Sequence, residues 1–306
     1  MNIYQQDNIT LHNTDALSLL AQLPDNSVDL IATDPPYYKV KGDAWDNQWQ
    51  NKQAFFTWLD SILVEYQRVL KPTGSIYLFA GPHLATQVEL AMAKQFEMLN
   101  HLIWRKPSGR HNGCNKESLR RYFPQTEHIL FAESKKPRAF AYEPIRFYLD
   151  NARQVTGISR KQIDQACCCQ MSGHWFDCSQ WSFPSEPHYQ TMNALFGYTM
   201  KPYAELKAEY KAIKQQRRYF AVTKAVPFTN VWDFKPVQWY EGKHPCEKPL
   251  DLMRHIVSAS SRAGDLVLDT FVGSGSTALA CRDLGRRFVG CEMGLGEFEG
   301  AVGRLT

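Results

Sequence analysis

The feature that most constrains this chain is the run Asp34-Pro35-Pro36-Tyr37, which follows an apolar segment at 28–33. The segment predicts a buried parallel strand that delivers the four residues to the carboxyl edge of a sheet, where open α/β folds bind ligands. Two prolines remove two backbone donors, so the carbonyl oxygens of Asp34 and Pro35 remain as acceptors. With the Asp34 carboxylate and the Tyr37 ring, they suit an exocyclic amino group on a planar base. A strand followed by a plain Pro-Pro turn is the alternative interpretation, and this motif alone does not decide.

A second motif lies near the far end, where an apolar segment at 265–269 is followed by Gly273-Ser274-Gly275. Glycines let a ligand approach the backbone, and the small residues that follow predict a helix whose N-terminal N–H groups face that ligand. The next apolar segment, 287–291, ends in Glu292, which is placed to accept ribose hydroxyls as acidic residues do in dinucleotide-binding folds. The third glycine and the long spacing of a dinucleotide fingerprint are absent, which favours a smaller nucleoside ligand without phosphates.

Together these motifs resemble the S-adenosylmethionine-dependent amino-methyltransferases of DNA. The Asp-Pro-Pro-Tyr run precedes Phe271-Val272-Gly273-Ser274-Gly275, with a long insert between them, an order similar to that of the circularly permuted β class. The resemblance covers residues 1–145 and 228–306 and includes Asn13-Thr14-Asp15 and the His-Pro-Cys-Glu-Lys-Pro run at 244–249. Four motifs in one order are far more specific than any single motif.

The architecture that follows is an α/β fold with a doubly wound, mostly parallel sheet of seven strands. The resemblance implies a Rossmann-like methyltransferase fold, circularly permuted, with a small helical insert that recognises DNA. Alternating apolar segments predict the seven strands near 8–12, 28–34, 75–79, 99–104, 127–132, 265–269 and 287–291, of which the fourth and fifth would form an antiparallel edge hairpin. The predicted parts are a first catalytic segment at 1–145, the insert at 146–227 and a second catalytic segment, which binds the cofactor, at 228–306.

The insert has helical signals of its own. Ser159 and Gln162 predict a capped helix at 157–166, Ser185 predicts a further helix start, and 203–219 has an amphipathic pattern. Both a helix-turn-helix unit and a plain helical insert fit these signals.

Candidate site residues follow from the motifs and from the resemblance. The resemblance gives the catalytic role to Asp34, Pro35, Pro36 and Tyr37. It implies that S-adenosylmethionine is bound by Asp15, Asp34, Lys248, Asp269, Phe271, Gly273, Ser274, Gly275, Thr277 and Glu292.

The activity implied is methyl transfer to the N6 amino group of a flipped-out adenine in double-stranded DNA, with low sequence specificity. Asp at position 34 is commoner in the family with adenine than with cytosine. Alternatives are an N4-cytosine methyltransferase, an inactive DNA-binding regulator and an RNA methyltransferase. The insert also resembles those of phage and prophage enzymes, and a restriction–modification role belongs to the same family.

Charge is distributed unevenly along the chain. Residues 101–224 hold 20 Lys and Arg against 10 Asp and Glu, although the net charge of the whole chain is only +4. A basic middle between acidic ends indicates a region that contacts a polyanion. The candidate DNA-binding residues are Arg105, Lys106, Arg110, Lys116, Arg120, Arg121, Arg160 and Lys161; an ordinary solvated basic surface is the alternative.

Eight cysteines are present, three of them consecutive at 167–169. Reduced thiols fit this pattern better than a disulfide framework. A zinc site that includes His174 and Cys178 is an alternative, but the paired Cys-x-x-Cys spacing is absent, and we expect no metal ion. The chain has no apolar run long enough to cross a membrane and no signal-peptide pattern, so we expect a cytoplasmic protein. The sequence does not predict the oligomeric state.

Overall fold

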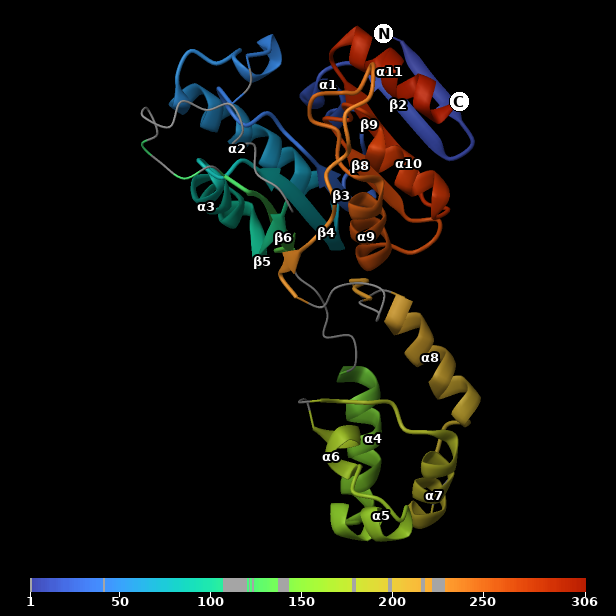
Figure 1. Ribbon diagram of the computed structural model, residues 1–306. Coiled ribbons are helices and arrows are strands. Elements are labelled where there is room, and N and C mark those ends of the chain that lie inside the picture. The colour runs from blue at the N-terminus through green and yellow to red at the C-terminus, as the bar shows by residue number, and fades with distance from the viewer. Residues whose placement is uncertain are drawn as a thin grey trace. The chain divides into compact units, whose positions relative to one another are not determined.

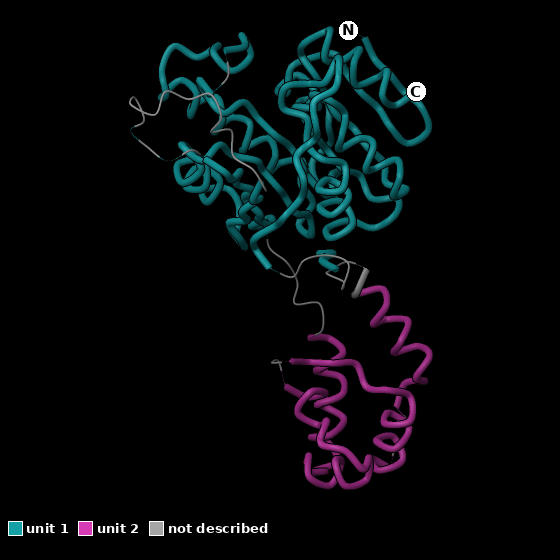
Figure 2. The backbone as a smooth tube through the Cα atoms, in the orientation of Figure 1, with its two compact units in different colours: residues 1–137, 218–306 teal, residues 138–217 magenta. Residues whose placement is uncertain are grey.

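The computed structural model describes residues 2–40, 42–106, 120, 122, 124–136, 143–177, 180–197, 200–215, 218–221 and 229–306. The chain forms two compact units (Figure 2). We call residues 1–137 and 218–306 the sheet unit, and residues 138–217 the helical unit.

A single mixed sheet organises the sheet unit (Figure 1). Its order in the described residues is β1 (Ile3–Gln6), β2 (Ile9–Asn13), β9 (Arg287–Glu292), β8 (Leu266–Asp269), β3 (Val28–Thr33), β4 (Leu70–Ala80), β6 (Thr126–Ser134), β5 (Phe96–Arg105) and β7 (Val231–Trp232). The five strands from β2 to β4 in this order are parallel, whereas β6 is antiparallel to both β4 and β5. Strands from the two ends of the sequence, β3 and β8, are therefore direct neighbours.

The predicted count of seven strands is wrong, because the described sheet has nine. The first additional strand, β1, has only four residues, of which the last two are polar, and it is mostly exposed, so it lacks the apolar pattern of a buried strand. It pairs with β2 through a turn in which Asp7 has φ 51°. The second, β7, is two residues long and pairs with β5. The expected edge hairpin is also modified, since β6 lies inside the sheet between β4 and β5.

Helices cover both faces of the sheet. On one face, α1 (Ala16–Leu20), α2 (Lys52–Val69) and α3 (Ala85–Gln95) share a core with β3 and β4. On the other, α9 (Leu250–Ser260), α10 (Ser276–Asp283) and α11 (Leu295–Leu305) pack over β8 and β9. This is the three-layer arrangement expected of a doubly wound α/β fold.

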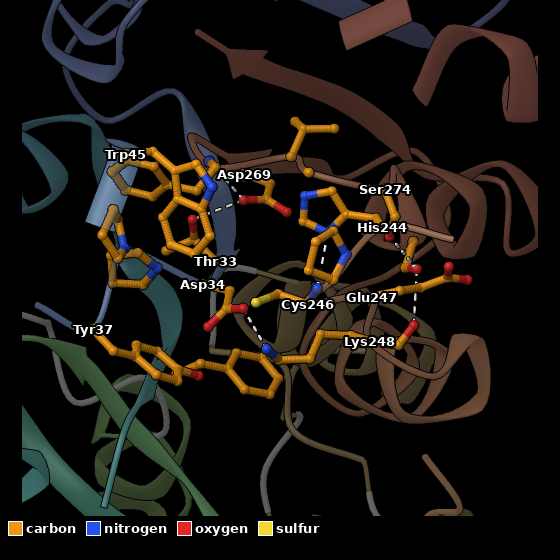
Figure 3. Close-up of a pocket in the computed structure, with 18 of the residues that line it drawn as sticks. Thr33, Asp34, Tyr37, Trp45, His244, Cys246, Glu247, Lys248, Asp269 and Ser274 are labelled. Carbon is orange, nitrogen blue, oxygen red and sulfur yellow. Dashed lines mark hydrogen bonds and ion pairs between the residues drawn. The ribbon is translucent and has the colours of Figure 1, made fainter. Parts of the chain in front are cut away.

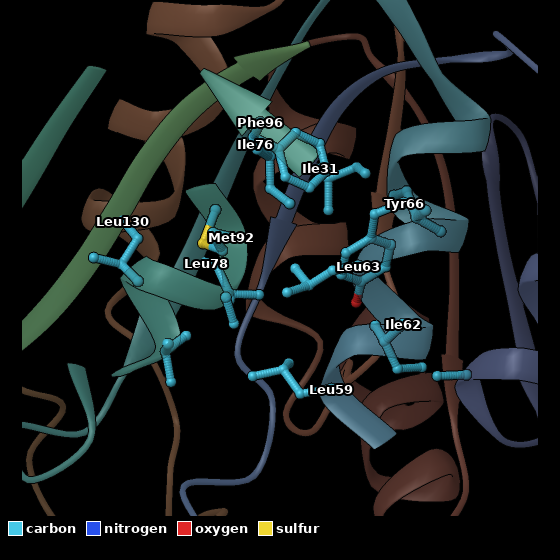
Figure 4. Close-up of a cluster of buried hydrophobic side chains, with 14 of the residues drawn as sticks. Ile31, Leu59, Ile62, Leu63, Tyr66, Ile76, Leu78, Met92, Phe96 and Leu130 are labelled. Carbon is cyan, nitrogen blue, oxygen red and sulfur yellow. The ribbon is translucent and has the colours of Figure 1, made fainter. Parts of the chain in front are cut away.

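Helix α2 shows how the sequence builds the first of these faces. The side chain of Asn51 caps its start by accepting from the Ala54 N–H at 2.9 Å. Apolar residues recur at helical spacing, so that Leu59, Ile62 and Leu63 all point into the core (Figure 4). Burying each such side chain contributes about 1.5–3 kcal/mol, which fixes the helix on the sheet.

The helical unit comprises α4 (Glu143–Thr156), α5 (Arg160–Ala166), α6 (Ser172–Phe176), α7 (Glu186–Phe196) and α8 (Tyr203–Gln215). These helices enclose a core of their own that includes the buried residues Leu149, Trp175 and Leu206. The predicted capping box is present at the start of α5, where the Ser159 and Gln162 side chains each bond the other's backbone N–H. In the described part of the chain, no helix is both long enough and apolar enough to cross a membrane.

Candidate active site

A cavity of about 850 Å³ opens at the carboxyl ends of β3 and β8 (Figure 3). Four segments that are distant in sequence line it: 14–17, 33–37, 243–248 and 269–274. They meet because parallel strands present their carboxyl ends at one edge of the sheet, where the order of neighbouring strands reverses. Aromatic side chains complete the wall, including Trp45, which belongs to the short 3-10 helix Ala44–Asp46, and Trp104 on β5.

Asp34 lies in this cavity directly after β3. Its Oδ2 atom forms an ion pair with the ammonium group of Lys248, which reaches it from the segment before α9 (Figure 3). Its Oδ1 atom is buried and has no hydrogen-bond partner among the described residues. Burial raises the pKa of Asp34, an effect that Lys248 opposes. The site therefore contains one carboxylate oxygen held by a cation and one unsatisfied acceptor.

Glu127 forms the other side of this charged cluster. It stands at the start of β6, where its Oε2 lies 3.3 Å from the Lys248 ammonium and its Oε1 pairs with Lys106. Burial would raise the pKa of Glu127, but the two lysines outweigh burial and lower it to about 2. Burial would likewise lower the pKa of Lys248, but the Asp34 and Glu127 carboxylates leave it above its usual value. Two carboxylates and two ammonium groups thus balance in charge.

Tyr37 lies beside this cluster with its ring on the cavity wall. Its hydroxyl donates to Glu127 Oε2 at 3.4 Å, and the Lys248 ammonium lies 5.7 Å from the ring centroid. Burial and the nearby Asp34 carboxylate raise the pKa of Tyr37, so the hydroxyl stays protonated. Asp34, Pro35, Pro36 and Tyr37 all line the cavity.

Asp269 ties the cavity floor together at the end of β8. It accepts from the hydroxyls of Thr33 at 2.7 Å and Thr277 at 2.6 Å, and from the Phe271 N–H at 3.0 Å. These bonds join the end of β3, the start of α10 and the glycine-rich turn. Burial raises the pKa of Asp269 to about 6, although the three bonds oppose the rise. Asp269 therefore links these three segments and has a structural role in the cavity.

Both glycines of the glycine-rich turn have positive φ angles, which larger residues rarely adopt. Gly273 has φ +49°, and a Cβ atom there would lie 3.1 Å from the His244 ring. Gly275 has φ +78° and precedes α10. Glu292, at the tip of β9, accepts from the N–H groups of Gly273 at 2.9 Å and Gly294 at 3.1 Å. Its carboxylate thus faces the turn from the neighbouring strand.

The predicted cofactor residues gather around the same cavity, with one exception. The cavity is lined by Asp15, Asp34, Lys248, Asp269, Phe271, Gly273, Ser274, Thr277 and Glu292, whereas Gly275 does not line it. Asp15 caps α1 by accepting from the Ser18 N–H at 3.0 Å. Lys248 differs from expectation in its contacts, since its ammonium group faces Asp34 and Glu127.

The predicted DNA-binding residues separate into several groups. Lys106 lies in the cavity wall, paired with Glu127. Arg105 bonds Asp233 at 2.6 and 2.7 Å, and Arg160 bonds Asp177 at the same two distances. Lys161 and Arg120 are exposed. Three of the residues, Arg110, Lys116 and Arg121, lie outside the described residues, as does Cys178 of the alternative zinc site.

Sequence analysis missed Glu127 and His244 as cavity residues. Glu127 has one signal, a carboxylate that comes just before the apolar part of a strand, but its position at the cavity depends on β6 running antiparallel to β4. His244 lies in a run of residues already associated with the cofactor motif, yet only the close approach to Gly273 shows where its ring is.

Comparison with known proteins identifies the class. Residues 28–302 match the family model N6_N4_Mtase, described as DNA methylase, and the chain belongs to this family. It is a DNA methyltransferase.

Two curated relatives and one solved structure illustrate the similarity. The chain is 29% identical over 294 residues to the type II methyltransferase M1.MboII of Moraxella bovis, covering 92% of this chain and 91% of that protein. It is 29% identical over 289 residues to the DNA adenine methyltransferase YhdJ of Escherichia coli K12, covering 93% and 78%. The crystal structure of an M1.HpyAVI–SAM complex superposes with a TM-score of 0.55 at 21% identity, covering 97% and 99%.

Proposed function

We propose that this DNA methyltransferase transfers the methyl group of S-adenosylmethionine to the N6 amino group of an adenine flipped out of double-stranded DNA. The observation that carries the proposal is Asp34 Oδ1, a buried acceptor without a hydrogen-bond partner among the described residues. An unsatisfied buried acceptor is costly, and a donor supplied by a substrate removes the cost. An exocyclic amino group is such a donor.

The chemistry requires the amino nitrogen to present a lone pair that is otherwise delocalised into the ring. Acceptors that bond the amine hydrogens turn this lone pair out of conjugation and stabilise the positive charge that develops on nitrogen. Asp34 Oδ1 and the Pro35 carbonyl are the acceptors we assign to this task. The nitrogen then bonds the methyl carbon, the carbon–sulfur electron pair stays on sulfur, and the nitrogen later releases a proton to solvent. Because no strong base is needed, holding the groups in line supplies most of the rate.

S-adenosylmethionine supplies the activated methyl group on a sulfonium, and the residues at the other half of the cavity fit this ligand. Because residue 273 is glycine, no Cβ atom fills the space between the turn and the His244 ring, and a ligand can approach the backbone there. Glu292 is positioned by two backbone N–H groups at the tip of β9, as a ribose-binding carboxylate should be. Asp15 is assigned to the adenine ring, and Phe271, Ser274 and Thr277 to the methionine region. Asp269 holds the turn, and through it the ligand's position.

The target base is assigned to the part of the cavity between Asp34 and Tyr37. The ring of Tyr37 offers a flat stacking surface, and Pro36 limits the motion of the segment that carries it. A base inside a duplex is inaccessible to this cavity, so it must leave the stack, at a cost of a few kcal/mol.

Adenine is favoured over cytosine by two arguments. Asp at position 34 is commoner in the family with adenine, and YhdJ, 29% identical to this chain, is named as an adenine enzyme. The family name covers both N6 and N4 methylation, so identification of the methylated base in the product distinguishes the two activities. We place the enzyme in the cytoplasm, with its DNA substrate.

Finer features of the family also belong to this proposal. The strand order, with the Asp34 strand preceding the glycine-rich strand in sequence, supports the circularly permuted β class. We assign target recognition to the helical unit, with phosphate contacts from exposed basic residues such as Lys161, and we favour a phage or prophage type with low sequence specificity. The type II relative M1.MboII supports the alternative context of a restriction–modification pair.

The test is direct analysis of the product. Purified protein is incubated with duplex DNA and S-adenosylmethionine labelled on its methyl group, and the DNA is digested to nucleosides and chromatographed. We expect label in N6-methyladenine and none with Asp34→Ala. Label in N4-methylcytosine would overturn the adenine assignment. Label only when single-stranded RNA replaces DNA would overturn the DNA substrate, and binding of DNA without any label would support an inactive regulator.

A further inference from the structure

The segment 233–243 forms a border of the cavity outside the motifs discussed above. It runs from β7 toward α9 without regular helix or strand, and Lys235, Val237, Gln238 and Trp239 all line the cavity. We call it the rim segment. None of its residues belongs to the family motifs. The site described so far gives no role to Trp239, which is more exposed than the neighbouring Tyr240.

Both ends of the rim segment are anchored to the sheet unit. At the first end, Arg105 makes two hydrogen bonds to the Asp233 carboxylate, and the Trp104 indole donates to the Phe234 carbonyl at 2.7 Å. At the other end, the Tyr240 hydroxyl donates to Glu247 at 2.6 Å. Trp239 precedes Tyr240, whose side chain is held by this hydrogen bond. The backbone at Trp239 is therefore anchored, although its side chain is exposed.

Trp239 itself is 85% exposed. What distinguishes Trp239 from other exposed apolar side chains is that it also lines the ligand cavity, so its ring is accessible to a substrate that enters there. Lys235, four residues before it, is also exposed on the same segment and lines the same cavity. An aromatic ring and a cation on one segment are a combination that suits a base and its phosphate.

Resting on the proposed function, we propose that Trp239 inserts into the DNA stack and fills the gap that the target adenine leaves. Extruding one base leaves its two neighbours without a stacking partner, and apolar or aromatic wedges compensate in proteins that unstack DNA. Tyr37 cannot do this, because it is partly buried in the cavity wall, where we place the flipped base. Trp239 lines the same cavity but faces solvent, as a wedge must.

The alternative is that Trp239 stacks on the flipped base itself, beside Tyr37. The two roles differ in how they respond to the pairing of the target. A wedge lowers the cost of leaving the duplex, so its removal matters less when the target is unpaired and that cost is already small. A residue that stacks on the flipped base contributes equally with a paired and an unpaired target.

The test uses two duplexes that are identical except opposite one target adenine, which faces thymine in the first and an abasic site in the second. We expect Trp239→Ala to lower kcat/KM about ten- to hundredfold on the paired target and less than about threefold on the unpaired target. Trp239→Phe, which keeps an aromatic ring, should retain most of the activity on both. Leu90→Ala, which removes another exposed apolar side chain away from the cavity, is the matched control.

A second measurement replaces the target adenine with 2-aminopurine, whose fluorescence rises when it leaves the stack. Trp239→Ala should reduce that rise while S-adenosylmethionine affinity and the melting temperature stay unchanged. Equal losses of activity on the paired and unpaired targets, or no loss on the paired target, would overturn the wedge. Failure of the proposed function is distinguishable, because the wild-type protein would then form no N6-methyladenine on either duplex.

Discussion

Lys248 holds Asp34 across the cavity, although the two residues are 214 positions apart in sequence. The ammonium group occupies one carboxylate oxygen and leaves the other, Oδ1, without a partner among the described residues. Glu127 supports the same ammonium group from β6. The arrangement fixes the carboxylate of Asp34 in one orientation, which a substrate amine requires if its lone pair is to be aligned with the methyl group.

Replacement of Asp34 is the first prediction. Asp34→Ala should abolish methyl transfer and leave the Kd for S-adenosylmethionine within about tenfold of wild type, since the main partner we assign to Asp34 is the target amine. It also removes one of the two carboxylates that neutralise the buried Lys248, so we expect a loss of stability of up to about 3 kcal/mol.

Methyl incorporation, calorimetry with S-adenosylmethionine and urea denaturation measure the three quantities separately. Asp34→Asn is the control for shape, because it keeps an acceptor but loses the charge. Near-normal turnover of Asp34→Ala would contradict the role of this carboxylate.

Glu127→Gln provides a prediction about pH. The folded protein lowers the pKa of Glu127 to about 2, whereas an unfolded chain has a value of about 4.3, a difference of about 3 kcal/mol. Because the folded pKa is depressed, this stabilisation is present above pH 4.3 and is lost as pH falls toward 2. We expect Glu127→Gln to be less stable than wild type at pH 7, with a difference that shrinks at pH 4 and below.

Urea denaturation at pH 7, 5, 4 and 3.5 tests this, with Glu97→Gln, an exposed residue of β5, as the control. A stability difference that stays constant over this range would show that Glu127 does not interact with Lys248 and Lys106 through its charge.

Much of this site could be predicted because its residues follow apolar strands. Asp34 and Glu292 come at strand ends, and parallel strands bring such ends to one edge. The glycines at 273 and 275 predict the turn from their residue type alone. Local capping signals were equally informative, as the Ser159–Gln162 box at α5 shows.

What could not be predicted depends on pairing between distant elements. Glu127 reaches the cavity only because β6 is inserted antiparallel between β4 and β5, a choice that the strand's own sequence does not encode. The same limit applies to Arg160: its charge predicts a phosphate contact, whereas its position opposite Asp177 is a property of how α5 packs. Strand β1, being short and mostly exposed, lacks the apolar pattern on which the count of seven rested.

Gly273→Val should prevent cofactor binding. A valine side chain would occupy space that the ligand needs. In addition, residue 273 has φ +49°, a backbone conformation that is strained for valine. A Cβ atom there would lie 3.1 Å from the His244 ring and would displace it. We expect S-adenosylmethionine affinity to fall at least about hundredfold in a folded variant. Gly300→Ala is the matched control, because nothing lies within 4 Å of a Cβ atom there. Unchanged affinity in calorimetry would place the cofactor elsewhere.

DNA affinity should depend strongly on salt, since the basic middle of the chain would displace counterions from phosphates. The structure distinguishes two adjacent residues of α5. Lys161 is exposed, whereas Arg160 bonds Asp177 at 2.6 and 2.7 Å. We therefore expect Lys161→Ala to reduce the slope of log affinity against log salt concentration by about 0.9 and Arg160→Ala to change it less.

Fluorescence anisotropy with a labelled duplex at several salt concentrations measures both slopes. If the affinity of the wild-type protein were the same at low and moderate salt, the assignment of the basic middle to phosphate contacts would be wrong.

The last prediction is that methylation has loose sequence requirements. Tight readers of DNA present arginine forks to guanine, the commonest specific contact, each worth about 1–3 kcal/mol of discrimination. In the helical unit, three arginines already bond a nearby carboxylate: Arg146 with Glu143, Arg153 with Asp150, and Arg160 with Asp177. Lys161 is exposed, and we expect it to contact phosphates, which position the protein without carrying sequence information.

We therefore expect modified adenines in many sequence contexts when a plasmid is methylated to completion and its modified positions are sequenced. Plasmid treated with Asp34→Ala is the background control. A titration of enzyme separates preference from requirement, because a loose enzyme first modifies favoured contexts and then the remainder. Modification that stays confined to one short motif at the highest enzyme concentration would mean that other side chains read base edges, and the specificity proposed here would be wrong.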